Sequence, residues 1–323
     1  MPDLGAENTF EQCISEMALA GFSGSEIGNK YPSDPAVLKP YLDIRGLQIC
    51  NAWFSSYLTS KPYEETIAAF KQHCDKLHAL GAKVIGASEQ GNSIQGCLDK
   101  SILDEKPVYT EEQWQTVARG FNEMGAYARS KGMYFTVHHH MGTGVQTAEE
   151  IDRLMELTDP ELVFLLFDSG HLTFAGIDPV PVLEKYARRV KHVHLKDVRL
   201  DVYNNRVVPE HMSFLDAVRA GVFTVPGDGD VDFKPIFDIL DRTGYEAGWW
   251  SRPSRTRPRP TPLPTRSRPA STLKRSPVCK ITTMGEWFIA TPPIFVYYLF
   301  PLWILLLFAV EFDIVKLKLG KEF

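Results

Sequence analysis

Histidines and carboxylates gather in one part of this chain, at the ends of short apolar runs. Seven of the nine histidines lie between His138 and His211, and "YFTVHHHMGTGV" ends one apolar run with three of them in succession. "FDSGH" contributes Asp168 and His171, and "VKHVHLKD" contributes His194. Imidazole and carboxylate groups from separate segments are typical ligands for Mn²⁺, Co²⁺, Zn²⁺ or Fe²⁺. The pattern therefore predicts a site for a divalent metal.

Side-chain direction limits how many of the three consecutive histidines can enter one site. Because side chains alternate faces along a strand, His138 and His140 share one face and His139 points the other way. We therefore assign His139 to a structural or outward-facing position. A single histidine or aspartate at a strand end is more often structural than a ligand. The combined pattern reverses that expectation for Asp168 and His194.

Several other polar residues end apolar runs. The predicted strand ends carry Glu26, Asn51 with Trp53, Glu89, His138 with His140, Asp168 with His171, and His194 with Lys196 and Asp197. Lys196 and Asp197 follow a predicted ligand closely, which favours a functional role over a surface pair. Glu89 stands in the loop "SEQGNSIQG", where contact with substrate hydroxyls and plain solvation are equally consistent with the sequence. His192 shares a face with His194 but lies a layer deeper, so we assign it to packing.

The elements that must position these residues alternate regularly along the chain. Apolar runs predict strands at about 23–28, 46–52, 82–89, 133–140, 162–168, 190–195 and 245–250. Amphipathic stretches predict helices at about 9–20, 34–43, 63–80, 111–131, 147–157, 178–188 and 232–242. Such units predict an α/β fold, a (β/α)₈ TIM barrel that lacks strand 1 and the end of strand 8, with catalytic groups at the carboxyl ends of its strands. An open doubly wound sheet is the alternative, but the first strand-turn-helix carries no GxGxxG.

Composition narrows the classes of partner. The chain has 323 residues, 44% of them hydrophobic, which suffices for a buried core. Its formal net charge of −5 argues against nucleic acid, because a phosphate backbone needs a basic surface. Five cysteines without CxxC spacing suit a reducing cytoplasm, and "MPDLGAENTFEQC" has no signal-peptide pattern. We therefore expect a cytoplasmic protein that binds a small molecule.

The composition changes abruptly near residue 250. Residues 1–250 predict the barrel, whereas residues 251–285 are rich in Arg, Pro and Ser and predict disorder. Residues 286–323 form an apolar tail whose uninterrupted apolar run, 294–310, is near the lower limit for a membrane span.

Six phrases of the chain resemble one family. "EMALAGFSGSEIG", "SEQGNSIQG", "VHHHMGTGV", "DSGHLTFAG", "HVHLKDVR" and "PGDGDVDF" follow the order of the inosose dehydratases, within the sugar phosphate isomerase/epimerase superfamily of xylose isomerase-like TIM barrels. The resemblance covers roughly residues 8 to 250. It implies loss of water from 2-keto-myo-inositol (scyllo-inosose), giving a trihydroxycyclohexane-1,2-dione in inositol catabolism, with Mn²⁺ or Co²⁺. A metal would stabilise the charge that develops on the ketone oxygen.

The resemblance also implies roles for individual residues. It places three metal ligands at His138, Asp168 and His194, with His138 standing where related epimerases have a glutamate. We expect catalytic roles for His140, His171, Lys196 and Glu89, and substrate contacts from Asn51, Trp53 and Asp197. Imidazole suits general acid–base catalysis because its pKa lies near the working pH. We also expect that the chain can form a homo-oligomer.

Two departures from the family pattern stand at the two ends of the barrel. The family has a first strand before the segment that opens this chain, and a glutamate after the last strand completes its metal site. Here "WWSRPSRTRPRPT" follows instead, and permissible codons for it spell "VVEAEQDPAKAN" in a shifted frame. We interpret the residues after about Trp250 as an out-of-frame translation, with membrane association through 294–310 as the alternative. Two unpaired strand edges and a lost ligand predict impaired activity.

Three other functions stay open from the sequence. A ketose 3-epimerase or hydroxypyruvate-type sugar isomerase would share the barrel but prefer glutamate where His138 stands. A catalytically inactive or membrane-tethered binding protein would fit the lost ligand and the apolar tail. An apurinic endonuclease shares a metal-rich barrel, but its extra ligands are not apparent and the acidic balance opposes DNA binding.

Overall fold

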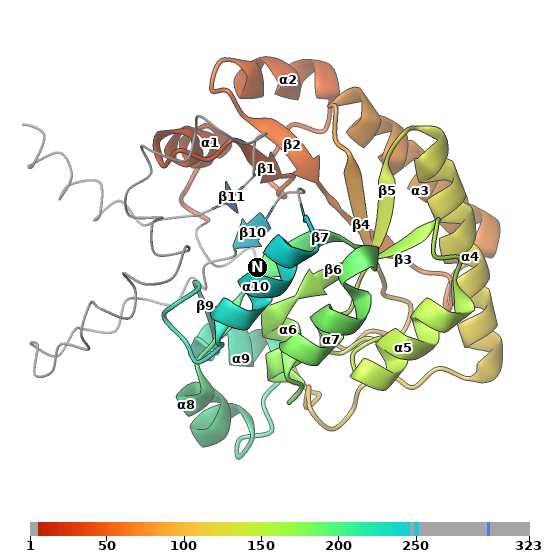
Figure 1. Cartoon of the computed structure of the whole chain (residues 1–323), viewed down its shortest axis with the longest axis vertical. Helices are drawn as coiled ribbons and strands as arrows, with labels where there is room; N and C mark the ends of the chain where they lie inside the picture. Colours follow the sequence, from red (N-terminus) through yellow and green to blue (C-terminus); the bar gives the residue numbers. More distant parts are fainter. Residues whose placement is uncertain (1–5, 246–248, 252–295, 298–323) are drawn as a thin grey trace, which may run out of the picture.

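A ring of parallel strands with helices on its outside forms the body of the protein (Figure 1). The computed structural model describes residues 6–245, 249–251 and 296–297. The principal strands are β1 (Gly24–Glu26), β2 (Gln48–Asn51), β3 (Trp53–Ser56), β4 (Val84–Glu89), β5 (Tyr134–His138), β6 (Val163–Asp168), β7 (Val190–Leu195) and β10 (Trp249–Ser251). Each of the seven predicted strands is present, and the predicted barrel architecture is confirmed.

The strands pair in an order that builds a barrel wall. One sheet has the order β11-β10-β7-β6-β5-β4-β3, and β1 pairs with β2 in a second sheet. Only Ala52 separates β2 from β3, so one stretch of chain pairs with β1 at its start and with β4 at its end. The strand predicted at 46–52 therefore continues to Ser56, because the serines that end it hide the continuation from an apolar pattern. At the other edge, β11 (Val296–Tyr297) pairs in parallel with β10.

The outer helices match the predicted amphipathic stretches. They are α1 (Phe10–Leu19), α2 (Pro35–Asp43), α3 (Tyr63–Ala79), α4 (Glu111–Ser130), α5 (Ala148–Leu157), α7 (Pro179–Tyr186) and α10 (Phe233–Arg242). Thr110 and Thr147 begin α4 and α5 with reciprocal capping boxes, which satisfy amide groups that the first turn leaves unpaired. The buried faces of the helices and the outward face of the sheet share one apolar core.

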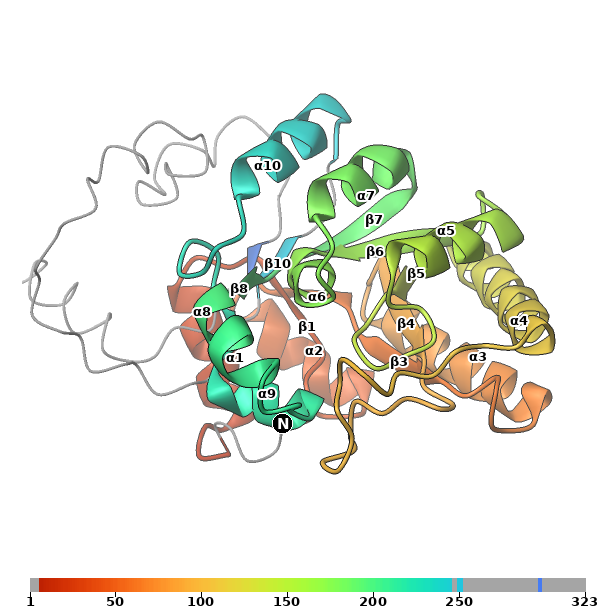
Figure 2. The ribbon, with the colours of Figure 1, turned by 90° about the horizontal axis from the view of Figure 1, so that it is seen from below.

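A cap of short elements, which the sequence patterns do not predict, covers the mouth of the barrel. It comprises α6 (Ser169–Phe174), β8 (Asp197–Val198), α8 (Leu200–Val202), the π-helical η2 (Tyr203–Val207), α9 (Phe214–Ala220) and β9 (Phe223–Thr224), while a 3₁₀ turn, η1 (Ala187–Arg189), precedes β7. Figure 2 shows α8 and α9 on the same side of the sheet as the loop between β4 and α4. Ile102 N donates to Met212 O at 3.1 Å and joins that loop to the cap. These elements are too short for hydrophobic periodicity to reveal them.

Parts of the sequence-based expectations fall beyond the described residues. No helix in the described ranges is long and apolar enough to cross a membrane. Apart from Ser251 and the two residues of β11, the predicted disordered segment 251–285 and the apolar run 294–310 lie outside the described residues.

Candidate metal centre and active site

Three predicted ligands lie at the carboxyl ends of neighbouring strands. His138 ends β5, Asp168 ends β6, and His194 stands near the end of β7. Asp168 and His194 are register partners in the β6–β7 pair, so their backbones are already adjacent. All three side chains are buried. Because the carboxyl ends of barrel strands meet at one mouth, the fold brings these groups together there.

One carboxylate oxygen of Asp168 contacts both histidines. Its Oδ2 lies 3.2 Å from Nε2 of His138, 3.4 Å from Nδ1 of His194 and 3.0 Å from Nζ of Lys196. The other oxygen, Oδ1, accepts the backbone N–H of His171 at 2.8 Å and thereby caps α6. The side chains of Asp168 and His194, which the sequence predicts as metal ligands, therefore lie in direct contact, and their role as ligands stays a prediction.

These contacts fit a divalent cation. Ligand atoms about 2.1 Å from one ion lie roughly 3.0–3.5 Å from one another, and the contacts of His138 and His194 with Asp168 Oδ2, at 3.2 and 3.4 Å, fall in that range. Ligand atoms of His138, Asp168 and His171 also lie within 4.8 Å of one another. Imidazole and carboxylate together form a donor set for borderline divalent metals. His138 and Asp168 therefore fit a metal together with a further imidazole, from His171 or from His194.

Burial and charge set the protonation of this group. Burial lowers the pKa of His138 well below its usual value, which favours the neutral imidazole that a metal requires. Burial would raise the pKa of Asp168, but positively charged Lys196 beside it helps to hold that pKa well below its usual value. Burial would likewise lower the pKa of His194, whereas the carboxylates of Glu26 and Asp168 raise it. The negative charge around His194 therefore favours a positive charge at this point, either a proton on His194 or a metal ion that takes its place.

A second pair of histidines stands beside these ligands. The ring centroids of His140 and His171 are 3.8 Å apart. His140 Nδ1 lies 2.8 Å from the carbonyl oxygen of Met141, and the Met141 N–H points to Nδ1 of His171 at 3.4 Å. A nitrogen that faces a carbonyl oxygen carries hydrogen, and one that faces an N–H carries a lone pair. The backbone of Met141 therefore assigns the Nδ1–H tautomer to His140 and the Nε2–H tautomer to His171.

Aromatic rings enclose the pair. The ring of Trp53 lies edge-on to His138 and His140, with centroids 5.5 and 5.7 Å away. Phe214, from the cap helix α9, lies 5.1 Å from His140 and 5.8 Å from His171 between centroids. Trp53 thus borders the site that the sequence predicts for it. Phe214 went unpredicted, because its helix is short and no local pattern points to the barrel mouth.

His139 points away from the site and supports it from behind. Its Nε2 accepts the backbone N–H of Asp168 at 3.1 Å, and the residue is buried. Burial lowers the pKa of His139 to about 4, so the imidazole stays neutral and can accept this hydrogen bond. The predicted structural position on the face away from the site is confirmed, and this outward face is buried.

Two predicted site carboxylates bind loops. Glu89 accepts hydrogen bonds from the hydroxyls of Ser56 and Thr59 and from the backbone N–H groups of Leu58, Thr59 and Gly91. Asp197 accepts backbone N–H groups of Val198, Gly227, Gly229 and Val231. Both carboxylates are buried. Their contacts hold the loop after β3 and the "PGDGDVDF" loop, and both loops border the mouth.

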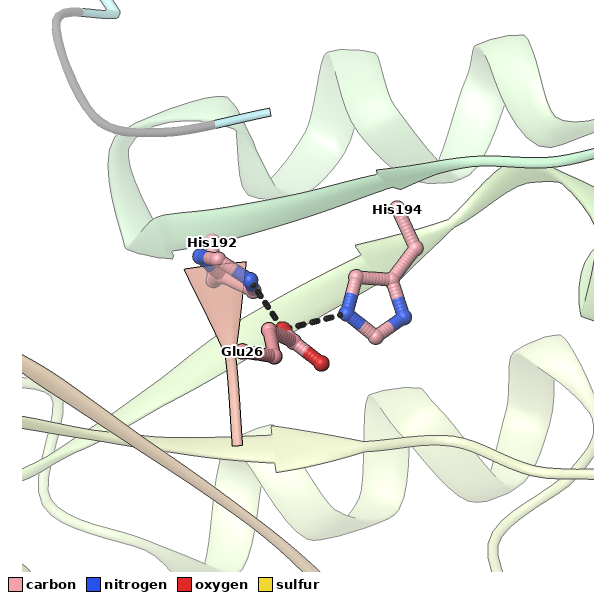
Figure 3. A group of neighbouring side chains, drawn as sticks. All are labelled: Glu26, His192 and His194. Carbon is pink, nitrogen blue, oxygen red and sulfur yellow. Dashed lines mark hydrogen bonds and ion pairs between the residues drawn. The ribbon is translucent and has the colours of Figure 1, made fainter. Parts of the chain in front are cut away.

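One polar cluster at this end of the barrel is not predicted from the sequence. Oε1 of Glu26 lies 2.7 Å from Nε2 of His192 and 3.0 Å from Nε2 of His194 (Figure 3). Asn51 donates its Nδ2–H to the same oxygen at 2.8 Å and accepts the Gly86 N–H at 2.7 Å. His192 is buried as predicted, but in a polar network and not in apolar packing. A glutamate at the end of the first strand, opposite a His-x-His alternation, was the signal that could have revealed it.

Sequence comparison finds close relatives along most of the chain. A family model described as "Xylose isomerase-like TIM barrel" matches residues 14–266. The inosose dehydratase of Clostridium tetani (strain Massachusetts / E88) is 61% identical over 249 residues, which are 77% of this chain and 83% of that protein. The inosose dehydratase of Geobacillus thermodenitrificans (strain NG80-2) is 62% identical over 250 residues, again 77% of this chain and 83% of that protein.

Solved structures share the fold at much lower identity. The IOLI protein with a binding zinc atom has a TM-score of 0.59 and 16% identity, covering 77% of this chain and 85% of that one. The probable 3-DHS dehydratase AsbF from Bacillus anthracis has a TM-score of 0.56 and 17% identity, covering 75% of this chain and 86% of that one.

Proposed function

Because this chain belongs to the xylose isomerase-like TIM barrel family and, within it, to the inosose dehydratases, we propose that its buried site removes water from an inosose, a cyclic polyol ketone. The family is one of hydro-lyases, and the product would be a trihydroxycyclohexane-1,2-dione. The observation that carries the proposal is the meeting of His138, His194 and Lys196 on one oxygen of Asp168.

We propose Mn²⁺ or Co²⁺ as the cofactor, held by His138, Asp168 and His194. When bound, such an ion supplies positive charge for the ketone oxygen as the proton on the neighbouring carbon is lost. Lys196 stays paired with Asp168 and keeps that carboxylate ionised as a ligand. The pair also adds a cationic group to a site from which solvent is largely excluded.

The adjacent histidines His140 and His171 divide the proton transfers between them. The Nδ1–H tautomer of His140 leaves the lone pair on Nε2, which accepts the proton from the carbon next to the ketone. The Nε2–H of His171 donates a proton to the departing hydroxyl group on the next carbon, so that water leaves. One C–H and one C–O bond break, a C=C bond forms, and the resulting enol tautomerises to the dione.

The other predicted residues surround this chemistry. We propose that Trp53 contacts the substrate ring, since it borders both His138 and His140. Asn51, Glu89 and Asp197 act through the groups they hold, because their side chains already bind neighbouring protein groups. Direct roles for Glu89 in catalysis and for Asp197 in substrate binding stay predictions.

We further propose that turnover by this chain is slower than that of its relatives. No acidic residue stands between Glu246 and Glu286 to supply the carboxylate expected after the last strand. Incubation of the full chain with scyllo-inosose and Mn²⁺ or Co²⁺ tests both points, with the Clostridium tetani relative assayed in parallel. We expect the dione at a reduced rate. No dione at any enzyme concentration would refute the dehydratase, and a rate equal to the relative's would refute the impairment.

A partial-reaction experiment tests the division between the two histidines. In D₂O under single-turnover conditions, His140→Gln should lose both deuterium exchange next to the ketone and dione formation, each by about 10²–10⁴-fold. His171→Gln should lose dione formation to a similar extent but still exchange deuterium. Exchange that survives in His140→Gln and fails in His171→Gln would reverse the assignment.

A further inference from the structure

Glu26 concentrates three hydrogen-bond donors on a single oxygen at the mouth of the barrel. Its Oε1 contacts Nε2 of His192 at 2.7 Å, Nε2 of His194 at 3.0 Å and Nδ2 of Asn51 at 2.8 Å. Glu26 ends β1 and Asn51 ends β2, whereas both histidines lie on β7, far along the chain. Figure 3 shows Glu26 in contact with both histidine rings. The Glu26 side chain is 15% exposed and those of His192 and His194 are 1% and 5% exposed, so bulk water does not replace these bonds.

The groups around Glu26 Oε1 point N–H hydrogens at this oxygen, and this arrangement disfavours a second metal ion there. The orientation of the Asn51 amide is fixed, because its Oδ1 accepts the Gly86 N–H at 2.7 Å. Its NH₂ group therefore faces Glu26 Oε1 as a donor. Glu26, His192 and His194 place three ligand atoms within 4.8 Å of one another, which is close enough for a metal. An ion there would need lone pairs on both Nε2 atoms and would face the hydrogens of the Asn51 amide.

We propose that Glu26 is a positioning residue that holds His194 in the Nε2–H tautomer and so turns its Nδ1 lone pair toward the cation site at Asp168. Nδ1 of His194 lies 3.4 Å from Asp168 Oδ2, and two acceptors at that distance repel each other unless Nδ1 carries a proton or a metal ion lies between them. Metal-bound histidines typically donate their other N–H to a carboxylate, which fixes the ring and strengthens the ligand. This inference rests on the proposed metal site and adds the residue that prepares it.

Cation affinity of the full chain tests the proposal. Glu26→Ala removes the acceptor and the charge, and Glu26→Gln keeps an acceptor oxygen without the charge. In titrations with Co²⁺, we expect one ion per chain, about 10–100-fold weaker binding in Glu26→Ala and an intermediate loss in Glu26→Gln. Glu150→Gln is the matched control, because Glu150 is 17% exposed and likewise accepts several hydrogen bonds away from the site, and its affinity should stay unchanged.

Histidine ¹⁵N spectra of the metal-free protein separate this inference from the proposed function. We expect hydrogen on Nε2 of His194 in the unaltered chain and in Glu26→Gln, with Nδ1 also protonated toward Asp168 when no metal is present. In Glu26→Ala we expect a share of rings without hydrogen on Nε2. If the chain binds no Co²⁺ but the tautomer still depends on Glu26, the proposed metal site fails and the positioning role stands. If Glu26→Ala changes neither the protonation of His194 Nε2 nor the Co²⁺ affinity, the positioning role of Glu26 is overturned. Two ions in the unaltered chain and one in Glu26→Ala would overturn it in favour of a second metal site.

Discussion

Two pairs of histidines at the barrel mouth have their protons placed by different means. In the pair His140 and His171, the backbone of Met141 offers its carbonyl to one ring and its N–H to the other. In the pair His192 and His194, the Glu26 carboxylate accepts from both rings. A backbone unit offers one acceptor and one donor, so it imposes opposite tautomers. A carboxylate only accepts, so it imposes the same tautomer on both rings.

The difference matches the tasks proposed for the two pairs. Elimination needs one proton acceptor and one proton donor, and opposite tautomers provide them without a charge. A metal ligand needs a lone pair held in one direction, and a nearby negative charge strengthens the attraction for the ion. Protons placed by a neutral backbone group therefore suit proton transfer. Protons placed by a charged carboxylate suit cation binding.

The largest effect is expected at Asp168, which contacts the His194 ring of one pair and accepts the backbone N–H of His171 from the other. Asp168→Asn should remove the bound cation and lower turnover on the order of a thousandfold or more, because the ligand charge is lost. Metal analysis and turnover of the purified variant measure both. Asp178→Asn is the matched control, since Asp178 also caps a helix and asparagine caps equally well. Retention of a full complement of metal in Asp168→Asn would contradict the site.

The tautomers of His140 and His171 can be disturbed without replacing either histidine, because the backbone of Met141 sets them. Gly142 has φ +76°, and a Cβ there would lie 2.7 Å from the side chain of Ile102 and 3.1 Å from the backbone N of Gln95. Gly142→Ala should shift the peptide next to Met141 and lower turnover about 10–100-fold while cation affinity is kept. Gly176→Ala shares φ +76° but meets nothing within 4 Å, so it should show only the backbone strain. Equal turnover in the two variants would argue against placement by Met141.

Replacement of His139, which accepts the backbone N–H of Asp168, is expected to lower stability more than turnover. His139→Leu leaves the Asp168 N–H without its acceptor and should cost about 1–3 kcal/mol of unfolding free energy. The unfolded chain protonates His139 near its ordinary pKa of 6.5, whereas the folded chain does so only near 4. Stability from this group is therefore present above pH 6.5 and is lost as the pH falls toward 4. Urea unfolding across that range should show a weaker pH dependence in the variant, and an identical slope would contradict the assignment.

The smallest effect on chemistry is expected at Glu89. Glu89→Gln should lose some of its five loop hydrogen bonds, raise KM severalfold and leave kcat within about threefold. Steady-state kinetics separate the two constants. A thousandfold fall in kcat would support the direct catalytic role that the sequence predicts for this residue.

Sequence patterns predict the barrel well and its cap poorly. The long helices and apolar strands show their periods directly, so β4 to β7 and α3 to α5 lie close to where they are expected. The short elements between β7 and α10 leave no such trace, and Phe214 on α9 is therefore missed. Asp168 and His194 are found because each ends an apolar run on adjacent strands. Glu26 is passed over as a ligand-site residue because its partners follow it by well over a hundred positions.

The sequence by itself determines which side chains reach the barrel mouth, because strand alternation and parallel pairing are local rules that a chain carries in its order of residues. It separates His139 from His138 and His140 without any coordinates. Only the tertiary structure decides which ring nitrogen holds each proton. That choice depends on which acceptor or donor lies within about 3 Å, and distant segments supply these groups after the barrel has formed.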